Sequence, residues 1–159
     1  MREIEFRGKC IRDKNREYRS NYRNGDWVYG LVTEIDNYYK RSVMTNFDGI
    51  SGIDIQTETI GQYTGLVDKN GTKIFEGDIV KKEYFDKPYS SKRKSKELIG
   101  VVKWKEFKAS KGVYEACFDV EITDKNYETY RCWNWSRFYE CEIIGNIYDN
   151  PELLEATDD

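Results

Sequence analysis

Histidine is absent from the 159 residues of this chain. Its absence excludes the commonest general base, the Ser–His and Cys–His nucleophile pairs, and the commonest metal ligand. The four cysteines contain no Cys-x-x-Cys pair, although structural zinc sites normally need closely spaced pairs; they are Cys10, Cys117, Cys132 and Cys141. We therefore expect no metal and no cofactor. The cysteines are expected to be free thiols in a reducing compartment, the last three as small apolar residues on strands.

Recognisable catalytic motifs are also missing. The sequence has no Walker A motif, no G-x-G-x-x-G and no G-x-S-x-G. Two carboxylates alone can cleave a glycosidic bond, but no pair stands out among the 29 acidic residues. We expect a non-catalytic protein without catalytic residues, and a carboxylate-dependent enzyme remains a remote alternative. No apolar run approaches the length of a membrane span, and the N-terminus lacks the apolar stretch of a signal peptide, so we expect a cytoplasmic protein.

Leucine and alanine are scarce, with 5 and 3 residues, whereas isoleucine and valine number 14 and 9. The chain also contains 13 Tyr, 7 Phe and 4 Trp. Helices favour Leu and Ala, while β-branched and aromatic side chains suit a pleated surface. The composition therefore predicts an all-β protein.

Alternation of polar and apolar residues locates the strands. The clearest run is 114–122, in which Phe118 and Val120 share one face. Asp68-Lys69-Asn70-Gly71 reads as a turn between two short apolar runs, and Asn150-Pro151-Glu152 predicts a short helix capped by Asn150. Further strands are expected near 2–7, 27–32, 40–45, 53–57, 99–104, 127–135 and 141–148, and short apolar runs at 66–67, 74–75 and 79–80 are separated by turns, the last of them Gly77-Asp78. The expected fold is a set of twisted, partly closed, barrel-like antiparallel sheets with one short C-terminal helix.

Charge is unevenly distributed along the chain, although the net charge is only −3. Residues 81–97 hold seven bases against three acids, while residues 140–159 hold seven acids and no base. The basic cluster could contact nucleic-acid phosphates through Lys92, Arg93, Lys94 and Lys96. The simpler interpretation is a solvated loop at the tip of a hairpin, and the low isoelectric point favours it.

Several sequence blocks resemble YopX-like phage and prophage proteins. In order along the chain, these are FRGK at 6–9, GDWVYG at 25–30, TIGQYTGL at 59–66, DKNG at 68–71, IFEGDIV at 74–80 and IIGNIYDNPELL at 143–154. The resemblance implies a single all-β domain over 1–155, followed by an acidic tail at 156–159, and a setting in the cytoplasm of a bacterial host. It implies no catalytic residue set. The polar stretches at 10–24 and 81–98 fall outside these blocks and look like insertions.

Binding of a macromolecular partner is the function that we expect. Tyr, Trp and Arg dominate interface hot spots, so Tyr38, Tyr39, Arg131, Trp133 and Trp135 are the candidate contacts. The tryptophans could equally be core residues. The partner is expected to be a host protein, and antagonism of host defence, of the anti-CRISPR type, is the finer hypothesis. A small barrel that binds nucleic acid is the alternative, and exposed edge strands leave homo-oligomers open.

Overall fold

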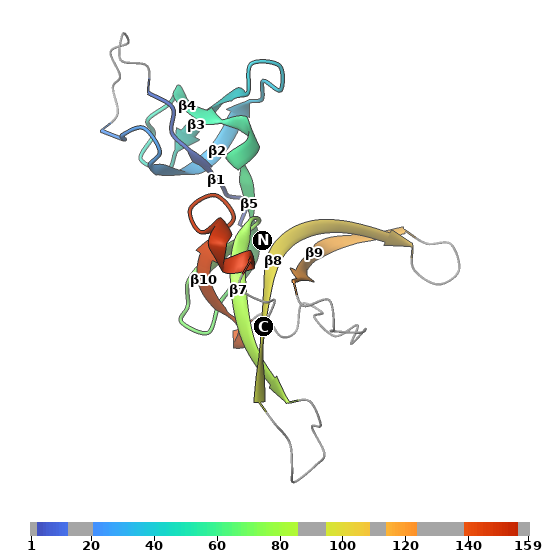
Figure 1. The fold of residues 1–159 in the computed structure, drawn as a ribbon. Coiled ribbons are helices and arrows are strands. Elements are labelled where there is room, and N and C mark those ends of the chain that lie inside the picture. Colours follow the sequence, from blue (N-terminus) through green and yellow to red (C-terminus); the bar gives the residue numbers. More distant parts are fainter. Residues whose placement is uncertain (1–2, 13–20, 86–94, 109–113, 124–138, 156–159) are drawn as a thin grey trace. The chain divides into compact units, whose positions relative to one another are not determined.

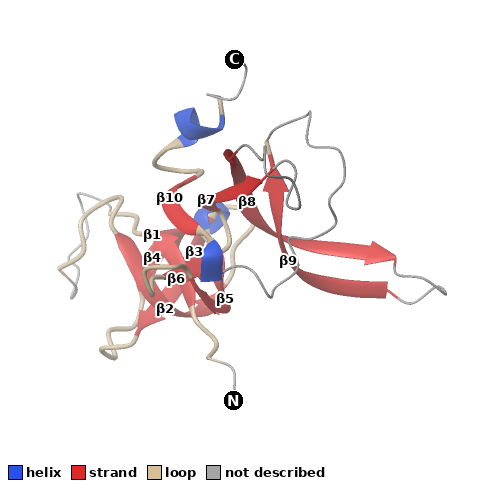
Figure 2. Ribbon diagram, turned by 90° about the horizontal axis from the view of Figure 1, so that it is seen from below, coloured by secondary structure: helices blue, strands red, loops and turns tan. Residues whose placement is uncertain are grey.

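The computed structural model describes residues 3–12, 21–85, 95–108, 114–123 and 139–155. By its internal contacts the chain divides into two units, Met1–Gly65 and Leu66–Asp159, and each is described by itself. Strands make up nearly all of the regular structure in these residues, with short 3-10 helices between them (Figure 1, Figure 2). The all-β prediction is confirmed.

The first unit is built on an antiparallel sheet. Its strands are β1 (Phe6–Lys9), β2 (Trp27–Glu34), β3 (Arg41–Asn46), β4 (Ile53–Gln56) and β5 (Gly61–Val67), and a 3-10 helix, η1 (Thr57–Thr59), follows β4. The strand order is β4-β3-β2-β1-β5, and β5 runs past Gly65 and is followed in the sheet by β6 (Lys73–Phe75).

Buried and exposed side chains alternate along strands of the first unit, and the buried ones form its core. On β3 every second side chain is buried, and Met44 has no exposed surface. Burial of apolar surface of this kind is the main stabilising contribution in a small unit. The buried cluster consists of Cys10, Val28, Met44, Ile53 and Ile55.

The second unit holds a four-stranded antiparallel sheet in the order β10-β7-β8-β9. Its strands are β7 (Asp78–Phe85), β8 (Ser95–Lys108), β9 (Tyr114–Ile122) and β10 (Glu142–Asn146). Strand β9 has the bounds predicted from alternation, and Phe118 and Val120 are both buried. Residues 81–85 and 95–99 pair as the stem of a hairpin, so the strands extend further into this polar stretch than the sequence predicts, and the tip lies outside the described residues. The predicted strand at 127–135 also lies outside them.

Neither sheet closes into a barrel in the described part of the chain. The six-stranded sheet has β4 and β6 at its edges, and the four-stranded sheet has β10 and β9. Partial closure occurs at one place in the first unit, where Cys10 forms an isolated antiparallel bridge with Ile55. Beside it, the amide of Ile11 donates to the carbonyl of Asp54 at 2.8 Å.

The carboxylate of Asp68 organises the turn predicted at 68–71. It is 4% exposed and accepts hydrogen bonds from the amides of Asn70 (2.8 Å), Thr72 (2.9 Å) and Ile143 (3.2 Å). Burial by itself would raise the pKa of Asp68, but the backbone donors outweigh it and the pKa lies below its ordinary value. One side chain therefore closes the turn and ties it to β10.

Polar residues in two other turns also bond to the backbone. Asp78 accepts from the amide of Phe75 at 2.8 Å, and Asn146 accepts from the amides of Tyr148 and Asp149, each at 3.0 Å. The predicted C-terminal helix is a 3-10 turn, η4 (Pro151–Leu154), with Pro at its start. Its predicted cap is wrong, because the side chain of Asn150 makes no cap hydrogen bond.

The described cysteines differ in accessibility. Cys10 and Cys141 are buried, whereas Cys117 is partly exposed. Burial raises the pKa of Cys141 to about 12 and also raises the pKa of Cys10. Because the thiolate is the reactive form, we expect native protein at pH 8 to be alkylated at Cys117 but not at Cys10 or Cys141. Mass spectrometry of each cysteine peptide, with urea-unfolded protein as the control, checks this result; rapid native labelling of Cys141 would contradict it.

Candidate functional site

Two of the predicted contact residues lie on the loop between β2 and β3. Tyr38 is 85% exposed and Tyr39 is 76% exposed, the two highest values among the large hydrophobic residues that the structure describes. We call residues 35–40, drawn in teal in Figure 1, the tyrosine loop. The other predicted contacts, Arg131, Trp133 and Trp135, lie outside the described residues.

The predicted nucleic-acid contacts are not gathered into a described site. Lys92, Arg93 and Lys94 lie outside the described residues. The fourth, Lys96, lies on β8, where its backbone is opposite Tyr84. The nucleic-acid alternative therefore has no described geometry behind it.

Asp36 sets the conformation of the tyrosine loop. Its Oδ1 accepts hydrogen bonds from the amides of Tyr38 (2.8 Å) and Tyr39 (2.9 Å). An aspartate that bonds amides two and three residues ahead forms a local turn, which is why Asp and Asn are frequent at such positions. The side chain of Asp36 therefore holds the backbone of both tyrosines.

The tyrosine loop is also tied to the neighbouring strands. The amide of Asp36 donates to Ser42 Oγ at 3.2 Å, and its carbonyl accepts from Thr57 Oγ1 at 2.9 Å. The two hydroxyl oxygens lie 2.8 Å apart, and the amide of Thr57 donates to the carbonyl of Lys40 at 3.2 Å. Residues from β3 and η1 thus hold both ends of the loop.

Lys40 closes the loop in a left-handed backbone conformation, with φ at 56°. It is the one non-glycine residue in the described chain with positive φ. For residues with a Cβ this conformation costs about 1–2 kcal/mol, and such residues cluster at binding and catalytic sites. The surrounding hydrogen bonds hold a conformation that the chain would not adopt by itself.

The loop displays an aromatic pair to solvent on a backbone that these hydrogen bonds hold in place. The ring centroids of Tyr38 and Tyr39 are 4.7 Å apart and the ring planes are at 86°, an edge-to-face contact. Ile35, at the start of the loop, and Leu31, on the β2 strand that leads into it, are also exposed. Exposed tyrosines that are ordered before binding lose little entropy on contact with a partner.

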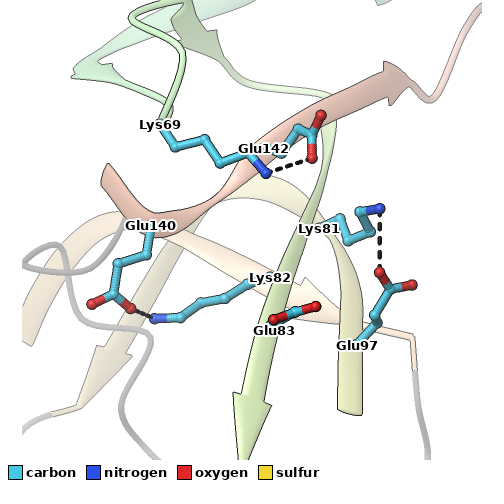
Figure 3. A pocket seen from close by; sticks show the side chains of 7 residues that line it. All are labelled: Lys69, Lys81, Lys82, Glu83, Glu97, Glu140 and Glu142. Carbon is cyan, nitrogen blue, oxygen red and sulfur yellow. Dashed lines mark ion pairs between the residues drawn. The ribbon is translucent and has the colours of Figure 1, made fainter. Parts of the chain in front are cut away.

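A second candidate is a charged hollow of about 340 Å³ on the second unit (Figure 3). Three lysines and four glutamates line it: Lys69, Lys81, Lys82, Glu83, Glu97, Glu140 and Glu142. Its ion pairs are Lys69–Glu142 at 2.7 Å, Lys81–Glu97 at 3.3 Å, and Lys82–Glu140. Opposite charges are thus distributed along its wall.

These ion pairs make the hollow a weak candidate for carboxylate chemistry. The hydrogen bond with Lys69 lowers the pKa of Glu142 below its ordinary value, and the same bond raises the pKa of Lys69. A general acid at neutral pH needs a carboxyl group with a raised pKa, which is the opposite shift. Within the described residues, no three Cys, Asp or Glu side chains gather closely enough to hold a metal ion.

Comparison with known proteins identifies the family. A family model described as "YopX protein" matches residues 6–155, nearly the whole chain. The chain belongs to the YopX family. Solved structures similar to this YopX-family chain include the crystal structure of protein EF1440 from Enterococcus faecalis, at 21% identity over 96% of this chain and 98% of that chain, with a TM-score of 0.34. A search of curated proteins finds no match.

The resemblance expected from the sequence blocks of this YopX-family protein is thereby confirmed. The tyrosine loop lies between two of those blocks, outside the residues that carry the resemblance. No helix in the described residues is long and apolar enough to cross a membrane.

Sequence reasoning missed the residues that hold the tyrosines in place. The role of Asp36 could have been predicted, because Asp and Asn are typical turn residues that bond to nearby backbone amides. The parts played by Ser42 and Thr57 depend on the pairing of β3 with β4, which brings together residues 15 positions apart in the chain. The charged hollow was missed for the same reason, because its glutamates and lysines come from several strands.

Proposed function

We propose that this YopX-family protein is a non-catalytic binding protein, that its partner is a protein, and that the tyrosine loop is its principal contact. The observation that carries the proposal is the pair Tyr38 and Tyr39, which is ordered by Asp36 and yet exposed to solvent. Tyrosine is enriched at interface hot spots, because its ring offers a large contact area with only two side-chain torsions to fix. A largely exposed aromatic pair, on a backbone that Asp36 holds in place, is well suited to contact an external partner.

A more specific proposal names the kind of partner and the role of the binding. The sequence blocks resemble phage and prophage proteins, so the partner is a host protein met in the bacterial cytoplasm. Small phage proteins of this kind often act against host defence, and we propose that role, of the anti-CRISPR type, for this chain. The support for this step is the family resemblance alone.

Quantitative capture from host cells tests the proposal. The full chain, a Tyr38→Ala/Tyr39→Ala variant and a Tyr139→Ala variant are each used to capture proteins from nuclease-treated bacterial lysate. Tyr139 is a matched control, because it is also an exposed tyrosine, at 63%, but lies in the second unit. We expect one host protein to be enriched by the wild type and the control, and its enrichment to fall at least about tenfold with the double variant, as loss of a hot spot predicts.

Each other result of this capture counts against a stated part of the proposal. Absence of an enriched protein, or equal enrichment by the double variant, contradicts the role of the tyrosine loop. A protein that is enriched from a parallel untreated lysate, but not from the nuclease-treated one, favours the nucleic-acid alternative. The identity of the enriched protein tests the finer step, since a component of a defence system supports it and a protein unrelated to defence contradicts it.

A further inference from the structure

Positions with positive φ are occupied by glycine throughout the described chain, with one exception in the tyrosine loop. Glycine adopts this conformation without strain, whereas a residue with a Cβ does not. Lys40, with φ at 56°, is the exception. The glycines have φ between 73° and 88°, and they are Gly25, Gly49, Gly52, Gly65, Gly71 and Gly77. The chain thus carries a lysine at a position where glycine is the easier residue.

The structural task of position 40 does not require a lysine side chain. The carbonyl of Lys40 accepts a hydrogen bond from the amide of Thr57 at 3.2 Å, which fastens the end of the loop to η1. Every amino acid offers the same carbonyl. The side chain of Lys40 is exposed and belongs to neither of the buried clusters. Glycine at this position would make the same backbone bond without the strain.

The ammonium of Lys40 forms no ion pair within the part of the chain that the structure describes. The carboxylates of the loop and of the neighbouring strand are engaged elsewhere. Asp36 Oδ1 accepts from the amides of the two tyrosines, and Asp54 pairs with Arg41. What lysine adds over glycine is therefore a long side chain whose charge has no use inside the described chain.

We propose that Lys40 is a third contact residue of the tyrosine loop and that its ammonium donates to a carboxylate of the protein partner. The inference rests on the proposed function, and it adds a residue and a partner group to it. Lys40 directly follows Tyr39, so its Cα lies about 3.8 Å from that of an exposed ring-bearing residue. An ammonium has three donors and no acceptor, and an ionised carboxylate is among its strongest acceptors.

The backbone strain at Lys40 is consistent with a binding role. Strained non-glycine residues persist where the surrounding structure holds them, and they cluster at sites that bind or react. Stability is often lower at such positions than another residue would give, because function selects the side chain. The two rings offer contact area, and the directed charge of Lys40 selects among partner surfaces.

Thermal unfolding of two variants tests whether the lysine side chain serves the fold. We expect the unfolding midpoint of Lys40→Gly to rise by about 2–5 °C, because glycine removes the strain. Lys40→Ala keeps the Cβ and the strain, so its midpoint should remain close to that of the wild type. A midpoint of Lys40→Gly that is unchanged or lower would show that lysine is not a strained choice, and would overturn the inference.

Selected peptides test the contact itself on the full chain. A library of random peptides displayed on yeast is sorted for clones that bind the wild type but not Tyr38→Ala/Tyr39→Ala. Asp and Glu should be at least about twice as frequent in these clones as in the starting library. In fluorescence anisotropy with the synthetic peptides, affinity should fall at least about fivefold in Lys40→Ala and in Lys40→Gly.

Two charge variants are the controls for peptide binding. Lys40→Arg keeps a cation at the position, and Arg23→Ala removes an exposed cation of the same unit that lies outside the tyrosine loop. Affinity should remain within about twofold of wild type in both. Equal binding by the wild type and Lys40→Ala, an excess of Lys and Arg in the selected peptides, or no tyrosine-dependent peptide at all would overturn the inference.

The outcomes here and in the capture experiment are separable. If a host protein is captured through Tyr38 and Tyr39 but the selected peptides bind Lys40→Ala as well as the wild type, the proposed function stands and the role of Lys40 is wrong. If acidic peptides bind through the tyrosines and Lys40 but no host protein is captured, the chemistry of the loop stands and the proposed function is wrong.

Discussion

Replacement of Asp68 by alanine is expected to destabilise the second unit by about 3 kcal/mol. The change leaves the amides of Asn70, Thr72 and Ile143 without their carboxylate acceptor. A hydrogen bond to a charged group contributes about 1.5–3 kcal/mol, and a buried donor that loses its acceptor adds a desolvation cost. Urea unfolding measures the loss, and hydrogen exchange of peptides from 66–80 and 139–148 shows whether it is local to this turn.

Asp68→Asn is the control variant. The difference in stability between it and the wild type is expected to depend on pH. The pKa of Asp68 is lower in the folded protein than in the unfolded chain. The carboxylate therefore stabilises the fold above its unfolded pKa, near about 3.9, and this contribution is lost as the pH falls through the folded value. We expect Asp68→Asn to be less stable than the wild type at pH 7, and the difference to shrink below about pH 4. A constant difference across this range would show that the ionised carboxylate is not the source of the stability.

Gly30→Ala is expected to destabilise the first unit by about 3 kcal/mol or more, at the upper end of what overpacking costs. Gly30 lies on β2 opposite Asn46 of β3. A Cβ at this position would lie 2.0 Å from the carbonyl oxygen of Thr45 and 2.8 Å from the Cα of Asn46. These are backbone atoms of the paired strand, so relief of the clash requires separation of β2 from β3. Thermal unfolding followed by circular dichroism measures the effect.

Gly52→Ala provides the matched comparison for Gly30→Ala. Gly52 has φ at +73°, and a Cβ added there would meet no atom of the described residues within 4 Å, so its substitution carries conformational strain without a clash. Strain of that kind costs about 1–2 kcal/mol. If the two variants lose equal stability, crowding between β2 and β3 is not what requires glycine at position 30.

Alternation predicts strands well where one face is buried and poorly where both faces are polar. Residues 114–122 alternate strictly because Phe118 and Val120 face a core, and the structure places β9 at the same bounds. By contrast, β8 extends from Ser95 to Lys108, well beyond the predicted 99–104. Its outer residues are mostly polar and are held by pairing with β7 and β9, which a local pattern does not encode.

The tyrosine loop, too, was only partly predictable from the sequence. Residue type alone selected Tyr38 and Tyr39 as candidate contacts, and the structure shows that both are exposed. Their arrangement was not predictable, because it depends on Ser42 and Thr57, which reach Asp36 only after β3 and β4 have paired. Local turn chemistry is readable from sequence, whereas contacts between distant residues require the register of the sheet.

The tyrosine loop separates the residues that build it from the residues that it displays. Asp36, Ser42 and Thr57 form the hydrogen bonds that shape the loop, and none of these bonds uses the side chain of Tyr38 or Tyr39. Substitutions at the two displayed positions can therefore change what the loop recognises at little cost in stability. In a binding protein of the kind proposed, such a division would let one scaffold keep pace with a partner whose own surface changes over evolutionary time.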